Sequence, residues 1–154
     1  MPSRRKTREF VLQVLYAADV QKKDPEELFT LFERNFDSDE DSDVKMERVV
    51  KEFARELIDE VSENLSRIDE TIGDLSHHWK VSRMNLVDRN IIRLAIAEMA
   101  RFPEIPRAVT LNEAIDLGKK YGTDNSPTFI NGILDKITEE SLMRHAPKPE
   151  EETD

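Results

Sequence analysis

The sequence contains no cysteine among its 154 residues. Disulfide bonds, thiolate nucleophiles and cysteine-ligated zinc are therefore excluded. Glycine occurs only four times and clusters of β-branched residues are few, which favours helices over sheets. No apolar run reaches the roughly 18 residues of a membrane-spanning helix, so the sequence predicts no contact with a membrane.

The N-terminal region also lacks an uninterrupted apolar stretch, because Gln13 and Asp19 interrupt the hydrophobic residues there. A signal peptide is not expected, and a cytoplasmic protein is predicted. Hydrophobic residues make up 38% and charged residues 36%, which suits a helical domain of this length. The formal net charge of −10 disfavours indiscriminate nucleic-acid binding. Because screening confines charge effects to about 10 Å, a local basic site is still allowed.

Apolar residues recur at helical spacing along most of the chain, which predicts an all-α fold of about seven helices. The expected helices cover 5–21, a segment that begins at Asp24-Pro25, 44–66, a short segment around 68–75, 84–101, 107–121 and 126–140. The helix at 84–101 is apolar around most of its circumference, which predicts a central position. We expect one domain at 1–140, a solvated acidic loop at 37–43 and a disordered acidic tail at 141–154.

Four cations lie within five positions near the start of the chain: Arg4, Arg5, Lys6 and Arg8. A solvated terminus is one interpretation, and phosphate binding by arginines is the other. Tyr16 lies about 20° from Arg5 on a helical wheel, on the polar side, where its ring could stack on a base. The residues alone leave these two interpretations equally favoured.

A second candidate site is the segment "KKYGTDNSPTF" at 119–129, between the last two long helices. Lys120 supplies charge there, and the start of the following helix offers free backbone N–H groups that suit phosphate. Phe129 is favoured as a core residue over a stacking platform, and Asn125 as a turn residue over a base reader.

Two carboxylates, Asp88 and Glu98, fall within the apolar helix. A buried carboxylate needs a partner, so an internal ion pair with Arg83 or Arg93 is one expectation. Contact with a partner protein is the alternative for Asp88. The ten-residue separation places the two carboxylates about 15 Å apart, too far for joint acid–base catalysis.

Chemistry at a metal or cofactor is not predicted. The neighbouring His77 and His78 point in different directions, and Trp79 is expected to be a core anchor. No phosphate-binding glycine loop and no nucleophile elbow is present, so neither a cofactor nor an enzymatic activity is expected.

Three segments together resemble the NusB family of bacterial transcription antitermination factors. They are "RRKTREFVLQVLY" at 4–16, "VDRNIIRLAIAEM" at 87–99, and "AVTLNEAIDLGKKYG" at 108–122 followed by "SPTFINGILDKI" at 126–137. The resemblance implies two three-helix bundles and an arginine-rich arm. It also implies binding to boxA-type RNA of ribosomal RNA operons, jointly with the ribosomal protein NusE. RNA polymerase and other Nus factors would complete the elongation complex.

The resemblance also assigns roles to residues. RNA binding is implied for Arg4, Arg5, Lys6, Arg8, Tyr16, Lys120, Asn125 and Phe129, and contact with NusE for Tyr16 and Asp88. Asn125 stands where relatives often have Asp, and losing that negative charge is expected to help binding. Gly132 lies inside a predicted helix at a cost of about 1 kcal/mol, which we attribute to close helix packing.

The oligomeric state is left open between a monomer and a homodimer, since both occur among such proteins. A helical module that binds only proteins is the main competing function. An accessory domain of an RNA cytosine methyltransferase is disfavoured, because the chain is short and has no cysteine.

Overall fold

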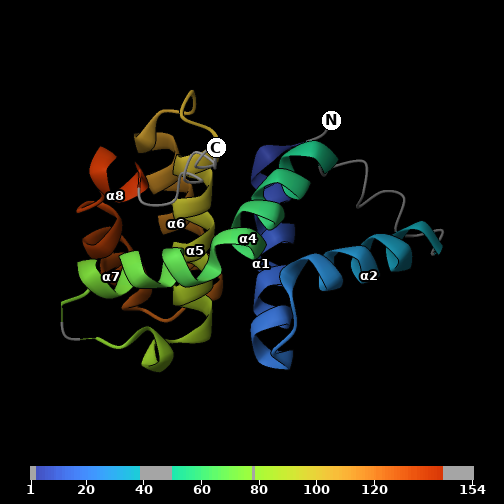
Figure 1. Ribbon diagram of the computed structural model, residues 1–154, viewed down its shortest axis with the longest axis horizontal. Helices are drawn as coiled ribbons and strands as arrows, with labels where there is room; N and C mark the ends of the chain where they lie inside the picture. Colours follow the sequence, from blue (N-terminus) through green and yellow to red (C-terminus); the bar gives the residue numbers. More distant parts are fainter. Residues whose placement is uncertain (1–2, 39–49, 78, 144–154) are drawn as a thin grey trace, which may run out of the picture.

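A computed structural model describes residues 3–38, 50–77 and 79–143 (Figure 1). These residues form seven α-helices, one short 3₁₀ helix and no strand, which confirms the predicted all-α fold. The elements are α1 (Arg4–Gln21), α2 (Pro25–Ser38), α4 (Lys51–Leu75), η2 (Val81–Arg83), α5 (Leu86–Arg101), α6 (Arg107–Tyr121), α7 (Ser126–Leu134) and α8 (Glu139–Met143). None of the described helices is both long and apolar enough to cross a membrane.

Local signals in the sequence set several helix ends. Ser3 caps α1 by accepting a hydrogen bond from the Lys6 backbone N–H at 3.4 Å. The Asp24 carboxylate accepts one from the Glu26 N–H at 3.0 Å, so the predicted Asp-Pro start of α2 is confirmed. Asn85 caps α5 through the Val87 N–H at 2.8 Å. Each cap satisfies a backbone donor that has no partner within its helix.

Three boundaries differ from the sequence-based expectation. The two helices expected around 44–75 are one helix from Lys51, kinked at Asn64, whose side-chain amide donates back to the Glu60 carbonyl at 3.3 Å. The helix expected over 126–140 is two helices, α7 ending at Leu134 and α8 over Glu139–Met143, and α8 reaches into the tail that was expected to be disordered from residue 141. The Ile137 carbonyl between them accepts from Arg107 at 2.9 Å. The expected acidic loop begins inside α2, and 39–49 lies outside the described residues, as does 144–154 of the expected tail.

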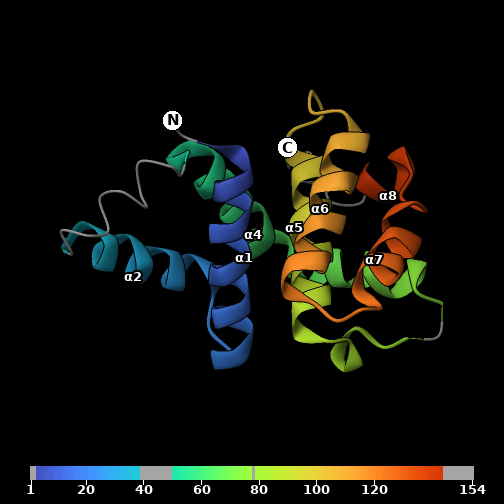
Figure 2. The same cartoon turned by 180° about the vertical axis from the view of Figure 1, so that it is seen from behind.

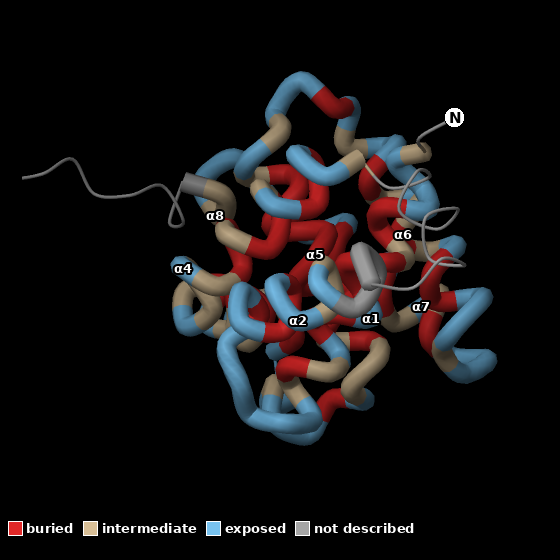
Figure 3. Tube along the Cα trace, turned by 90° about the vertical axis from the view of Figure 1, so that its right-hand side faces the viewer, coloured by how far each residue is buried: buried red, intermediate tan, exposed pale blue. Residues whose placement is uncertain are grey.

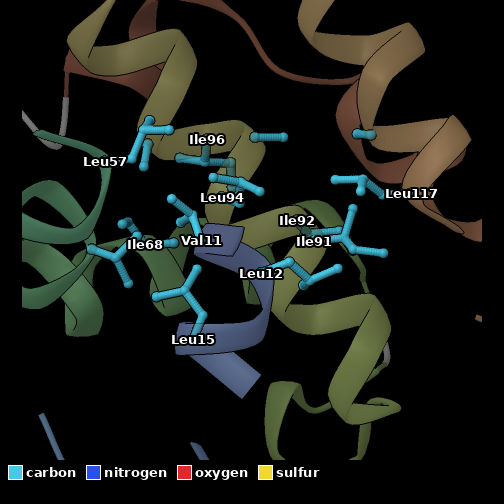
Figure 4. Packing of buried hydrophobic residues seen from close by; sticks show 14 of the residues in the cluster. Val11, Leu12, Leu15, Leu57, Ile68, Ile91, Ile92, Leu94, Ile96 and Leu117 are labelled. Carbon is cyan, nitrogen blue, oxygen red and sulfur yellow. The ribbon is translucent and has the colours of Figure 1, made fainter. Parts of the chain in front are cut away.

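The helices form two bundles joined by α4 (Figure 1). The first contains α1, α2 and the first half of α4, and the second contains α5, α6 and α7 with the second half of α4. The central position predicted for 84–101 is confirmed, because every residue from Asn90 to Met99 is buried in α5 (Figure 3). Core side chains of α1, α4, α5 and α6 meet in one cluster (Figure 4), including Val11, Leu15, Leu57, Ile68, Ile92 and Leu117.

Candidate nucleic-acid interface

The predicted basic residues of the two ends of the sequence meet on one face of the molecule. Figure 2 shows this face, with α6 between α1 and α7. The Arg5 guanidinium contacts Glu113 at 3.0 Å and Asp116 at 3.2 Å on α6. The Lys120 ammonium contacts Glu9 of α1 at 2.7 Å. The tertiary structure therefore joins the N-terminal cluster to the 119–129 segment, as a single RNA-binding site requires.

A groove of about 490 Å³ separates α1 from α6 on this face, which we call the α1–α6 face. Cations and carboxylates alternate along it: Arg5, Lys6, Lys119 and Lys120 with Glu9, Glu113 and Asp116. The three carboxylates were not among the residues predicted for this site. Their spacing was a usable signal, because Glu113, Asp116 and Lys120 share one side of a helix, as do Arg5 and Glu9.

The carboxylates hold the cations in place and in the charged state. The hydrogen bond from Arg5 to Glu113 raises the pKa of that guanidinium, and the hydrogen bond to Glu9 raises the pKa of Lys120. Burial alone would raise the pKa of Glu9, but the hydrogen bonds and charges of Lys120 and Lys6 lower it below its ordinary value. Arg5 and Lys120 nevertheless keep 61% and 53% of their side-chain surface exposed. Both side chains are therefore accessible from solvent although they are paired.

The cations in the first turn of α1 are unfavourable for the stability of this helix. Arg4, Arg5 and Lys6 lie in its first turn, which contains no acidic residue. The helix dipole is positive at this end, so it disfavours cations there. The stability of α1 therefore does not explain the cluster.

Arg8 does not belong to this exposed set, and the expectation that it is free to face RNA is wrong. Its side chain is buried, and its Nε lies 2.5 Å from a carboxylate oxygen of Glu98. The Thr110 hydroxyl donates to the other oxygen of that carboxylate. Arg8 precedes Val11 and Leu15 by three and seven positions, which puts all three on the buried side of α1.

The internal ion pair predicted for Glu98 therefore exists, but its partner is Arg8 and not Arg83 or Arg93. Arg93 instead pairs with Asp19 at 3.1 Å and with Asp69 at 2.7 Å. Arg89 joins this second network through Asp19 at 2.6 Å. Pairing across helices depends on tertiary packing, so spacing along the sequence did not reveal either network.

The ion pair expected for Asp88 is absent from the described structure. Asp88 is 7% exposed, and its Oδ1 is fully covered and has no hydrogen-bond partner there. A covered carboxylate oxygen without a donor is costly. Tyr16, the other residue expected to contact a partner, is 41% exposed on α1, a helix that packs against α5.

The corner between α6 and α7 combines exposed and buried members. Asn125 is exposed, as predicted for a turn residue, whereas the adjacent Ser126 is buried and accepts a hydrogen bond from the Thr123 N–H at 2.8 Å. Phe129 is half-buried, with its ring 6.2 Å from the Trp79 ring in an edge-on arrangement. The expectation of a core role for Trp79 is wrong, because 61% of this residue is exposed.

Two glycines show where this corner is tight and where it is open. A Cβ at Gly122 would lie 2.8 Å from the Gly118 carbonyl oxygen and 2.3 Å from the Ser126 hydroxyl, so only glycine fits the end of α6. A Cβ at Gly132 would have no atom within 4 Å. The attribution of Gly132 to close helix packing is therefore wrong, since its surroundings within the described structure are open.

Fold and face together define an all-α, two-bundle protein with a mixed-charge face that is bordered by exposed aromatic rings. The model of the NusB family matches residues 5–139. The chain belongs to the NusB family.

Similar proteins agree with this assignment. Transcription antitermination protein NusB of Desulforapulum autotrophicum is 44% identical over 137 residues, which cover 89% of this chain and 92% of that protein. The Geotalea uraniireducens protein of the same name is also 44% identical and is covered to 94%. The structure of T. maritima NusB superposes with a TM-score of 0.71 at 35% identity and covers 96% of both chains. A crystal structure of NusB and NusE in complex with double-stranded RNA matches with a TM-score of 0.68 at 28% identity, covering 86% of this chain and 92% of that one.

Proposed function

We propose that this protein is a non-enzymatic transcription antitermination factor that binds single-stranded boxA-type RNA together with a NusE-type ribosomal protein. The observation that carries the proposal is the α1–α6 face, where exposed cations of α1 and α6 line one groove. A relative of this fold with NusE and RNA in its crystal supports it. The RNA would be nascent transcript of ribosomal RNA operons, held within the RNA polymerase elongation complex.

Arginine side chains on this face are suited to the phosphates of such an RNA. Arg5 projects into the groove, and Arg4 lies with its guanidinium 5.1 Å from the centre of the Phe53 ring, so both side chains have defined positions. Guanidinium groups bind phosphate through two parallel hydrogen bonds. Lys120 is a further cation, five residues before Asn125 in the sequence. The neutral Asn125 adds no negative charge near the phosphates.

Asp88 is the candidate contact for the protein partner. Asp88 keeps 7% of its surface exposed, so a donor from the partner could contact this carboxylate, whose covered Oδ1 has no hydrogen-bond partner in the described structure. Tyr16 offers a ring with a polar tip, a residue type common at interfaces.

The proposal is tested by a variant that removes both exposed arginines, Arg4→Ala/Arg5→Ala. Affinity for labelled boxA RNA is measured by fluorescence anisotropy across a range of salt, with and without the NusE-type protein. Loss of two phosphate contacts on a single strand makes the slope of log K against log salt shallower by about 1.4 and weakens binding. Arg55→Ala is the matched control, because Arg55 is 58% exposed and does not line the α1–α6 groove.

The result also separates the two competing functions. Equal affinities and slopes for the double variant and the Arg55 control would refute RNA binding by this face. If the unaltered protein binds the NusE-type protein with no effect of RNA at any salt concentration, the chain is a protein-interaction module instead.

A further inference from the structure

The turn between α4 and η2 presents an exposed tryptophan that neither the core nor the α1–α6 face explains. Trp79 is the only tryptophan of the chain, and 61% of its surface is exposed. A ring of this size is mostly buried in folded proteins, so this degree of exposure indicates a binding role.

Hydrogen bonds fix the turn that carries Trp79. The Ser76 hydroxyl donates to the Trp79 carbonyl at 2.9 Å, and the Trp79 N–H donates to the Ser76 carbonyl at 3.3 Å. His77 between them adopts a left-handed conformation with φ 58°, which a residue with a side chain rarely takes. The exposed ring is therefore held at a defined place on the surface at a cost in backbone strain.

The Trp79 ring lies against one flank of α7. Its partner Phe129 contacts it edge-on, with the ring centres 6.2 Å apart and the planes at 67°. Asn125, Phe129 and Gly132 follow one another at spacings of four and three residues, so they share this flank. The Lys136 ammonium donates to the Leu75 carbonyl at 3.3 Å and ties the end of α7 to the end of α4.

The charge around Trp79 is also unlike the rest of this acidic chain. The twelve residues from Ser76 to Val87 contain no aspartate or glutamate, although the chain has 33 acidic residues. Lys80 and Arg83 are exposed and, in contrast to Arg5 and Lys120, neither is paired with a carboxylate in the described part of the chain. Unpaired cations beside an exposed ring suit a ligand that has both phosphates and aromatic bases.

Gly132 gives an independent indication of close approach by a ligand. Glycine weakens a helix interior, and no atom lies within 4 Å of the position that a Cβ would occupy there. Packing within the described protein therefore does not require glycine at this position. A ligand that passes over Phe129 toward Trp79 would require it, because a side chain at 132 would stand in its path.

We propose that Trp79, supported by Phe129, is a stacking site for an unpaired base, and that the RNA continues from the α1–α6 face over Gly132 to this site. The inference rests on the proposed RNA-binding function and extends the proposed RNA-binding surface to the α4–η2 turn. Phosphates next to the stacked base would contact Lys80 and Arg83.

The single tryptophan allows a direct test in the full-length protein. A boxA RNA that carries several extra nucleotides at either end is titrated while the emission of Trp79 is recorded. Stacking quenches that emission with the same saturation curve as RNA binding. Trp79→Ala is expected to lower RNA affinity about tenfold, in the range known for loss of one base–aromatic stack, and to leave the salt slope unchanged because no phosphate contact is lost. Trp79→Phe retains most of the affinity.

Leu31→Ala is the matched control, because Leu31 is an exposed apolar residue, 43% accessible, on α2 of the other bundle. Circular dichroism verifies that each variant keeps its helices. A second variant, Gly132→Ala, is expected to raise the melting temperature and yet weaken RNA binding, a combination that a purely structural role does not produce.

The outcomes separate this inference from the proposed function. If Arg4→Ala/Arg5→Ala weakens RNA binding while Trp79→Ala does not and the emission is unchanged, the stacking site is refuted and the function stands. If Trp79→Ala weakens binding of the NusE-type protein but not of RNA, the turn is a protein contact and the inference is wrong. If the unaltered protein binds no RNA, both fail.

Discussion

The buried pair of Arg8 and Glu98 allows a quantitative prediction about stability. Their side chains are 6% and 1% exposed, and the Arg8 Nε lies 2.5 Å from the Glu98 carboxylate. Removing one member leaves the other charge buried, which costs about 3–5 kcal/mol. Arg8→Met keeps the apolar stem and isolates this electrostatic loss from a loss of packing. A domain of this kind has about 5–15 kcal/mol of stability, so the variant loses a large share of it.

Urea unfolding followed by circular dichroism measures the effect. With a slope of about 2 kcal/mol per molar urea, the midpoint is expected to fall by about 1.5–2.5 M. Arg5→Met is the control on the same helix, because that side chain is 61% exposed, and its midpoint should change little. RNA affinity should show the reverse order, with the larger loss for Arg5→Met.

The double variant Arg8→Met/Glu98→Leu tests the cause. Replacing both charges by apolar groups should recover most of the lost stability, less about 1–3 kcal/mol for the Thr110 hydroxyl, which loses its acceptor. A midpoint for Arg8→Met within error of the Arg5→Met value would refute the reasoning. The reasoning would also be refuted if the double variant lost as much stability as the losses of Arg8→Met and Glu98→Leu added together.

Three further substitutions test the packing and charge described above. Asp19→Asn should cost about 2–4 kcal/mol at neutral pH, because it leaves Arg89 and Arg93 with fewer anionic partners. Burial would raise the pKa of Asp19, but the hydrogen bonds and charges of these groups lower it. Ionised Asp19 therefore stabilises the folded state above about pH 4, and this stabilisation is lost as the pH falls through the folded-state pKa. In urea titrations at several pH values the difference from the unaltered protein should shrink toward low pH, and a constant difference would contradict this. Gly122→Ala should lower the free energy of unfolding by about 1–3 kcal/mol through its clash with the Gly118 carbonyl, whereas Gly132→Ala should raise it by up to about 1 kcal/mol. Thermal unfolding measures both, and melting temperatures that shift in the same direction for the two variants would contradict this geometry.

Local signals explain which parts of the fold were predictable. The Asp24 cap and the apolar periodicity of 84–101 each act within a few residues, so the start of α2 and the helix α5 followed from sequence alone. The kink at Asn64 and the early end of α7 did not, because a side-chain bond and a contact from Arg107 override helix propensity there.

Some residues of the candidate site were likewise predictable from the sequence, and others were not. Spacing placed Arg5 and Tyr16 on the exposed side of α1, and the structure agrees. The assignment of Arg8 to that side was wrong although the wheel could have corrected it, since Arg8 shares a face with Val11 and Leu15. Trp79 was assigned to the core from its size alone, and only its place in the turn after α4 shows that it is exposed.

The sequence by itself determined the helical class, the Asp24 cap of α2 and the position of the basic cluster, because these depend on propensity, periodicity and neighbours within a turn. Only the tertiary structure decided which carboxylate each cation meets. Arg8 is neutralised by Glu98, 90 residues away, and Arg5 faces Glu113, 108 residues away. Pairs at such separations are set by how helices pack, which leaves no periodic trace in the sequence.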